Sequence, residues 1–228
     1  MIKLKDLSLG VEVEGGFDFS LQDKIDELFR GGFDHPRGEW KGDASVHISE
    51  GDGNGHEYAS GIFRGEKGLA GLVELLELFT RDNGYYSNDS CGIHLHVGLV
   101  EKGRFLSIYE LLPLLSRFEW VQELQEKAKK ISQRQAKRLE DTDNSYTNLY
   151  RDRADFKGNA RNHAKYKFIC YHTQGTLEFR FIFASENNEK VETIKWIVDE
   201  VLEELQKTFK REFKEEISRA MLKKSFSY

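Results

Sequence analysis

Three short segments carry polar side chains two residues apart, and this spacing places both side chains on the same face of a β-strand. The side chains are carboxylates, imidazoles and, in the third segment, a guanidinium. In chain order, the segments contain Glu12 and Glu14, His94 and His96, and Glu178 and Arg180. The residues between them are apolar, so each segment predicts a strand with one polar face and one core face. Thr176 extends the polar face of the third segment.

Paired carboxylates on one strand face repel each other and lose hydration when they are buried, and a bound cation offsets both costs. Two imidazoles at this spacing can bind one ion or two adjacent ions. Hard carboxylates mixed with imidazoles suit Mg²⁺ or Mn²⁺ better than a structural zinc ion. Each segment alone also fits a plainer interpretation, namely an exposed strand face, two hydrogen-bonded histidines or a surface Glu–Arg pair.

A fourth polar region lies between residues 43 and 57. It carries Asp43, Glu50 and Glu57, and its glycine-rich stretch at 50–55 predicts the end of a hairpin. The Gly53-Asn54-Gly55 sequence is better explained as a turn than as a phosphate-binding loop, because no Lys-Ser/Thr pair follows it.

Hydrophobic periodicity predicts the elements that must position these residues. Strands are expected at 7–14, 44–49, 56–60, 91–97, 166–172 and 176–183, and helices at 22–30, 68–80, 105–139 and 191–213. Paired strands with helices between the pairs predict an α+β fold, in which helices cover one face of a mainly antiparallel sheet. Because no Pro/Ser-rich linker divides the chain, residues 1–228 are expected to form one domain.

Composition limits the class of protein. The chain has 228 residues, of which 39% are hydrophobic and 32% charged, and this excludes wholesale disorder and a fibrous protein. No apolar run reaches membrane-spanning length, so no membrane partner is expected. Two cysteines outside any CxxC motif favour a reducing, cytoplasmic setting. The net charge of −5 argues against a protein whose whole surface binds nucleic acid.

A basic segment interrupts this acidic average. Residues 127–167 contain 12 Lys/Arg and 5 Asp/Glu, a net charge of +7, so the rest of the chain carries −12. The segment is either a solvated surface or a rim that attracts an anionic ligand such as a nucleotide phosphate. Within it, Arg161, Lys165 and Lys167 are candidate phosphate contacts, and the polar stretch at 141–162 is a candidate lid.

The ordered set of motifs resembles the amidoligase family. The set comprises Gly10-Val11-Glu12-Val13-Glu14, Trp40 with Asp43-x-Ser45, Gly55-His56-Glu57-Tyr58-Ala59-Ser60, Ser90-Cys91-Gly92-Ile93-His94-Leu95-His96-Val97, Lys165-Tyr166 and Thr176-Leu177-Glu178-Phe179-Arg180. The family's catalytic domain is similar to those of glutamine synthetase and γ-glutamylcysteine synthetase. The resemblance therefore implies a curved antiparallel sheet and an ATP-dependent ligase that uses several Mg²⁺ ions to join a carboxylate to an amine.

The resemblance also implies roles for individual residues. The implied metal ligands are Glu12, Glu14, Glu57, His94 and Glu178. His96 is expected near the transferred phosphate or the substrate, and Arg180 is expected to clamp a phosphate. Asp43 and Glu50 compete for the third acidic position of the second metal site, and Asp43 is the candidate with a catalytic role.

This ligand set is suited to phosphoryl transfer, because cations and basic side chains must neutralise the charge that moves between two anions. The expected cofactors are ATP and Mg²⁺ or Mn²⁺. The expected partners are an amine and a small-molecule or peptide carboxylate, with a second copy of the chain or a partner protein able to complete the site. Two alternatives are a metal-dependent hydrolase that uses His94 and His96, and a non-catalytic relic that binds nucleotide.

Overall fold

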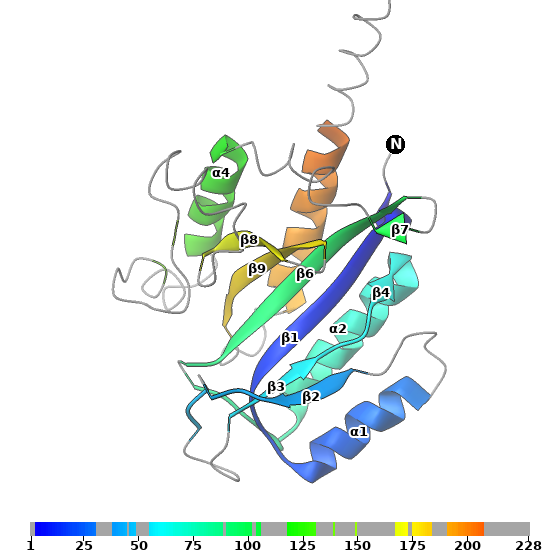
Figure 1. Cartoon of the computed structure of the whole chain (residues 1–228), viewed down its shortest axis with the longest axis vertical. Coiled ribbons are helices and arrows are strands. Elements are labelled where there is room, and N and C mark those ends of the chain that lie inside the picture. The colour runs from blue at the N-terminus through cyan, green and yellow to red at the C-terminus, as the bar shows by residue number, and fades with distance from the viewer. Residues whose placement is uncertain are drawn as a thin grey trace, which may run out of the picture.

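The computed structural model describes residues 3–30, 38–44, 46–48, 55–88, 90–101, 104–105, 118–130, 139, 149, 167–172, 175–183 and 191–207 (Figure 1). Within these residues the chain folds into an antiparallel sheet with helices beside it. The predicted α+β class with a mainly antiparallel sheet is therefore confirmed.

Two long strands form the centre of the sheet, β1 (Leu7–Phe17) and β6 (Gly92–Glu101). The strand order is β2-β3-β1-β6-β9-β8, and every described pair is antiparallel. The other members of this path are β2 (Glu39–Gly42), β3 (His56–Ala59), β9 (Thr176–Phe183) and β8 (Ile169–His172). The short strands β4 (Phe63–Arg64) and β5 (Tyr85–Tyr86) also pair with β1, and β7 (Arg104–Phe105) pairs with β6.

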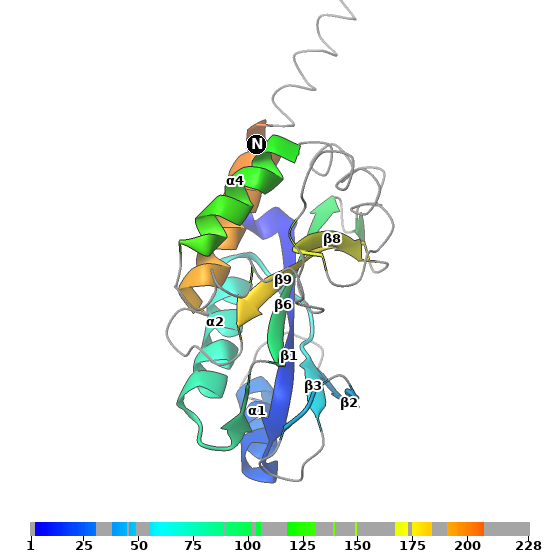
Figure 2. The same cartoon turned by 90° about the vertical axis from the view of Figure 1, so that its left-hand side faces the viewer.

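The described helices are α1 (Phe19–Arg30), α2 (Gly65–Arg81), α4 (Phe118–Lys129) and a helix at 191–207, and a 3₁₀ turn, η1 (Leu4–Asp6), precedes β1. Figure 2 shows α2, α4 and the helix at 191–207 on one side of β1, β6 and β9. On that side Val11, Val13, Ile93 and Leu95 are buried together with Leu75 of α2, because apolar residues alternate along both central strands. The opposite face of the sheet is left to the polar residues.

A bulge changes the alternation in β9. Ile93 lies opposite Ile182 and Leu95 lies opposite Phe179, so three residues of β6 are matched by four of β9. The buried series that includes Phe179 therefore continues at Ile182, one residue later than strict alternation predicts. Such bulges re-aim a side chain next to the extra residue, and Arg180 lies within this one.

Two predicted elements were wrong in position. The strand expected at 44–49 is instead β2, at Glu39–Gly42, and the described residues among 44–48 form a turn and irregular chain. This segment turns because the Val46 N–H donates to the Asp43 carbonyl, while Val46 is buried without strand pairing. The predicted helix at 105–139 begins too early, because Phe105 belongs to β7. The observed helix α4 ends at Lys129.

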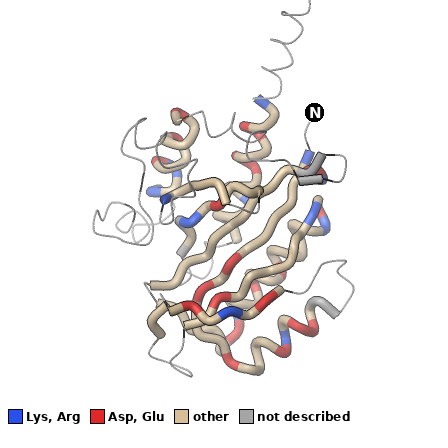
Figure 3. The backbone as a smooth tube through the Cα atoms, viewed as in Figure 1, with Lys and Arg blue, Asp and Glu red and all other residues tan. Residues whose placement is uncertain are grey.

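Figure 3 shows acidic positions concentrated toward the end of the sheet where β2 and β3 lie. Among the described residues, no helix has both the length and the apolar character needed to cross a lipid bilayer.

Candidate functional site

The register of the sheet brings the polar segments together. Opposite residues on neighbouring strands are Glu12 and His94, His96 and Glu178, and Glu14 and Glu57. These side chains project from the face of the sheet opposite the helices, because their apolar neighbours on each strand are buried in the core. Residues separated by more than 160 positions in the chain thus meet on one face of the sheet.

Glu12, His96 and Glu178 form what we call the first triad. One potential ligand atom from each residue lies within 4.8 Å of those of the other two. His96 and Glu178 are buried, and Glu12 is half-buried. A carboxylate, an imidazole and a second carboxylate at this spacing can bind one divalent cation.

Glu14, Asp43 and Glu57 form the second triad, whose potential ligand atoms also lie within 4.8 Å of one another. Asp43 follows β2 directly and is held there because its N–H donates to the carbonyl of Gly55 at 2.9 Å. Of the two candidates for the third acidic ligand of the second metal site, Asp43 lies beside Glu14 and Glu57. The other candidate, Glu50, lies outside the described residues.

His94 lies between the two triads. Its Nδ1 is 3.2 Å from Glu12 Oε2 and 3.6 Å from Glu178 Oε1, and its Nε2 is 3.6 Å from Glu14 Oε1. The family resemblance implies that His94 is a ligand and that His96 is near the substrate. In this structure His96 completes the first triad, and His94 contacts carboxylates of both triads.

His96 is held in place by its neighbours. Its Nδ1 is 3.0 Å from Thr176 Oγ1, and the ring of His172 meets its ring edge-on, with centroids 4.9 Å apart. Its Nε2 is buried, lies 3.5 Å from Glu12 Oε1 and has no hydrogen-bond partner among the described residues. The contact with Glu12 therefore directs this nitrogen into the first triad.

Both carboxylate oxygens of Glu178 are in contact with other groups. The Arg180 guanidinium donates to Oε1, and the Cys170 thiol donates to Oε2 at 3.5 Å. Burial raises the pKa of Glu178, but the positive charges of Arg180, His94 and His96 outweigh it, so this pKa lies below its ordinary value. Burial, together with the negative charge of Glu178, raises the pKa of the Cys170 thiol far above its ordinary value.

The carboxylates of the two triads have different electrostatic environments. Burial raises the pKa of Glu12, but the imidazoles of His94 and His96 more than compensate, and the net pKa is well below the ordinary value. The pKa of Glu57 is raised, first by burial and then by the negative charge of Glu12. Lys41, whose Nζ is 3.8 Å from Glu57 Oε1, only partly opposes this shift.

The backbone fixes the orientation of Glu14. The N–H of Gly92, the first residue of β6, donates to Glu14 Oε2 at 2.7 Å, and the Tyr85 hydroxyl donates to the Glu14 carbonyl at 2.9 Å. Glu14 is buried, the Gly92 N–H holds one of its carboxylate oxygens, and the other, Oε1, is 3.6 Å from His94 Nε2. A preoriented carboxylate of this kind is suited to metal binding.

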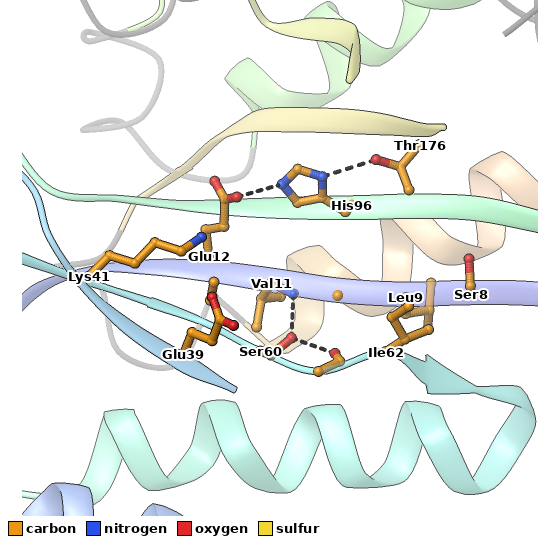
Figure 4. Close-up of a pocket in the computed structure, with 13 residues that line it drawn as sticks. Ser8, Leu9, Val11, Glu12, Glu39, Lys41, Ser60, Ile62, His96 and Thr176 are labelled. Carbon is orange, nitrogen blue, oxygen red and sulfur yellow. Dashed lines mark hydrogen bonds and ion pairs between the residues drawn. The ribbon is translucent and has the colours of Figure 1, made fainter. Parts of the chain in front are cut away.

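A pocket of about 390 Å³ adjoins the first triad (Figure 4). Its lining includes Glu12 and His96, the backbone at Gly10, and Lys41. Gly10 leaves space here, because a Cβ at this position would have only Ser60 Oγ and Gly61 O within 4 Å, at 3.7 and 3.8 Å. Ser8 Oγ, another lining atom, is buried without a hydrogen-bond partner among the described residues.

Of the predicted phosphate contacts in the basic segment, only Lys167 is among the described residues. Lys167 is half-buried and lies two residues before β8. Arg161, Lys165 and the candidate lid at 141–162, apart from Leu149, lie outside the described residues. Sequence reasoning missed Cys170 and His172, although their spacing of two within a predicted strand was a signal for a shared face.

No protein-family model matches the chain, and no curated protein is significantly similar to it. The interpretation of the site therefore depends on its geometry and on the resemblance of its motifs.

Proposed function

We propose that this protein is an ATP- and Mg²⁺-dependent carboxylate–amine ligase with a glutamine synthetase-like catalytic sheet. The observation that supports this most is that Glu12 and Glu14, two residues apart on β1, belong to two separate sets of cation ligands. Two cation sites on neighbouring positions of one strand suit a reaction in which a polyphosphate must be neutralised at several oxygens.

The residues present fit divalent cations. The two triads contain five carboxylates, and Mg²⁺ prefers oxygen ligands while it keeps several of its waters. A cation in the first triad would lie beside the buried Nε2 of His96, and a cation in the second triad would offset the burial and negative charge that raise the pKa of Glu57. Bound Mg²⁺ would neutralise the phosphate oxygens as charge moves between them.

The protein's own residues then have distinct tasks. Arg180 lies beside the first triad and can exchange its contact with Glu178 for a phosphate oxygen of the nucleotide. The pocket next to the triad is where we place the nucleotide, since Gly10 lets a ligand approach the backbone of β1 closely. Its volume of about 390 Å³ lies within the range of roughly 300–1,000 Å³ for small-molecule sites.

The reaction that we propose has two steps. The terminal phosphoryl group of ATP passes to an oxygen of the substrate carboxylate, and ADP leaves. The amine nitrogen then attacks the activated carbonyl carbon, phosphate leaves, and the amine loses a proton as the amide forms. Glu12 and Glu178 would hold the cation that the first step needs, and His96 would keep its Nε2 directed to the same place.

The first experiment measures binding, which does not depend on knowing the acid and the amine. Calorimetry with Mn²⁺ and a non-hydrolysable ATP analogue is expected to show metal-dependent nucleotide binding. Glu12→Gln and Glu178→Gln should each weaken it by at least about tenfold, because each removes a cation ligand. Glu74→Gln, an exposed position on α2, is the matched control and should leave binding unchanged.

The second experiment measures ADP and phosphate release with a panel of acids and amines, including amino acids, peptides and polyamines. Release that requires both an acid and an amine supports the ligase, and full activity in both variants would refute the assigned site. Tight zinc binding with hydrolysis and no nucleotide binding would favour the hydrolase. Nucleotide binding without turnover on any pair would favour the relic.

A further inference from the structure

The two ring nitrogens of His96 have different neighbours. Nε2 is 3.5 Å from Glu12 Oε1, and Nδ1 is 3.0 Å from Thr176 Oγ1 (Figure 4). His96 is 8% exposed, and within the described part of the chain its buried Nε2 makes no hydrogen bond. A carboxylate, an imidazole and a hydroxyl therefore lie in series, from the first triad to the start of β9.

The turn that leads into β9 fixes the position of Thr176. Gly175, which has a positive φ of 86°, donates its N–H to the His172 carbonyl at 2.9 Å, and Thr176 lies directly opposite His172. The His172 ring packs edge-on against the His96 ring, with centroids 4.9 Å apart. Gly98 leaves room for the Thr176 methyl group, because a Cβ at Gly98 would lie only 3.2 Å from it. The Thr176 hydroxyl is thereby directed at His96.

A hydroxyl can keep this hydrogen bond with or without an ion in the first triad. A neutral imidazole carries a proton on one nitrogen and a lone pair on the other. With the proton on Nε2, Nδ1 accepts a hydrogen bond from Thr176. With a cation at Nε2, the ring proton lies on Nδ1 and is donated to Thr176 Oγ1. Protons exchange with solvent in this change, so the net charge of the ring stays the same.

We propose that Thr176 is a positioning residue, whose hydroxyl keeps Nε2 of His96 directed at the first triad and accepts the Nδ1 proton when a cation binds. This inference rests on the proposed cation site and adds a residue that is not itself a ligand of the first triad. Metal-binding histidines usually donate their second ring nitrogen in this way, and loss of the partner lowers metal affinity by about 10- to 100-fold.

The first measurement needs no metal. NMR shifts of ¹⁵N-labelled histidine rings report the proton and the hydrogen bond at each nitrogen, and His96→Gln identifies the His96 signals by their loss. Thr176→Val keeps the shape of the side chain but removes the hydroxyl, so it should shift the Nδ1 signal. Thr176→Ser, which keeps the hydroxyl, should restore it.

The second measurement is Mn²⁺ binding in the absence of nucleotide. Electron spin-echo spectroscopy of Mn²⁺ on the ¹⁵N-histidine protein detects imidazole nitrogen bound to the ion, and the part of this signal that His96→Gln removes belongs to His96. Thr176→Val should weaken Mn²⁺ binding at this site by at least about tenfold, whereas Thr176→Ser should bind it as the wild type does.

Thr80→Val is the matched control for both measurements. The Thr80 hydroxyl donates to the Leu76 carbonyl at 2.7 Å within α2, so the same substitution there removes a hydroxyl far from the first triad. It should change neither the His96 signals nor Mn²⁺ binding. Circular dichroism confirms that each variant is folded, and Thr176→Ala, which also lacks the hydroxyl, replaces Thr176→Val if valine prevents folding.

An unchanged Nδ1 signal in Thr176→Val, wild-type Mn²⁺ affinity in that variant, or failure of Thr176→Ser to restore either property would overturn this inference alone. Absence of Mn²⁺ binding by the wild type would overturn the proposed function together with it. The two failures are therefore distinguishable.

Discussion

The two triads share strand β1 but differ in how their negative charge is balanced. In the first triad, His96 is itself a member and Arg180 donates to Glu178, so imidazole and guanidinium groups lie among the carboxylates. The second triad contains only carboxylates. Beside it lie His94, whose Nε2 is 3.6 Å from Glu14 Oε1, and Lys41, which is 3.8 Å from Glu57 with its side chain 48% exposed. Correspondingly, the pKa of Glu12 is lowered and that of Glu57 is raised.

This difference comes from the neighbouring strands. On one side of β1, strands β6 and β9 supply imidazoles and a guanidinium. On the other side, β3 and the residue after β2 supply further acids. Imidazole and guanidinium groups thus hold the pKa values of Glu12 and Glu178 below the ordinary value before any ion binds, while the pKa of Glu57 in the second triad is raised. Two adjacent sites can therefore have different affinities although they use the same strand.

The largest expected effect comes from removing the counter-charge of the first triad. Arg180→Ala leaves the carboxylate of Glu178, whose side chain is 2% exposed, without its guanidinium partner. Breaking a buried ion pair in this way costs about 3–5 kcal/mol, so the free energy of unfolding should fall by roughly that amount. Urea unfolding without metal measures it.

Arg81→Ala provides the control for this variant. Arg81 pairs with Glu77 on the surface of α2, with side chains 76% and 40% exposed, and its loss should change stability by less than about 1 kcal/mol. Added Mn²⁺ should restore part of the loss in Arg180→Ala, because a cation again neutralises Glu178. Equal stability of the two variants would show that the first triad is not balanced by Arg180.

A smaller effect of opposite sign is expected in the second triad. Glu57 lies directly opposite Glu14 on β1, and like charges at such positions are destabilising. Glu57→Gln removes this repulsion, so it should raise stability without metal by up to about 1 kcal/mol. The same change should weaken Mg²⁺ binding, which isothermal calorimetry measures.

The pH dependence of the free energy of unfolding provides a second test of the repulsion at Glu57. The pKa of Glu57 is higher in the folded than in the unfolded state, so its ionisation destabilises the fold above that pKa. As pH falls through the folded pKa toward the ordinary value of 4.5, folded Glu57 takes up a proton and the penalty disappears. The advantage of Glu57→Gln should therefore be greatest near neutral pH and vanish in acid. A constant advantage would contradict the repulsion.

The faces of the central strands could be predicted from sequence. Alternation around Glu12 and Glu14, and around His94 and His96, correctly separates polar from core residues, because a strand repeats every two residues. The α+β class follows from the same periodicity.

The grouping of these residues into triads could not be predicted, because it depends on register between strands far apart in the sequence. That register selects His96 for the first triad, and a backbone hydrogen bond from Asp43 to Gly55 brings Asp43 beside Glu14 and Glu57 in the second. The position of β2 was missed because Val46 and Ile48 are buried like strand residues but belong to irregular chain. The bulge that contains Arg180 has no clear signal in the sequence either.

The smallest expected effect on stability concerns Lys41. This variant tests whether the Lys41 ammonium group stabilises the carboxylates of the second triad. Lys41→Met removes a cation that is 3.8 Å from Glu57 Oε1 and largely hydrated, so stability should fall by no more than about 0.5 kcal/mol. Because Lys41 competes with a metal ion for Glu57, the same variant should bind Mg²⁺ slightly more tightly. A loss as large as that of Arg180→Ala would mean that Lys41 balances the second triad as Arg180 balances the first, and the contrast between them would then be wrong.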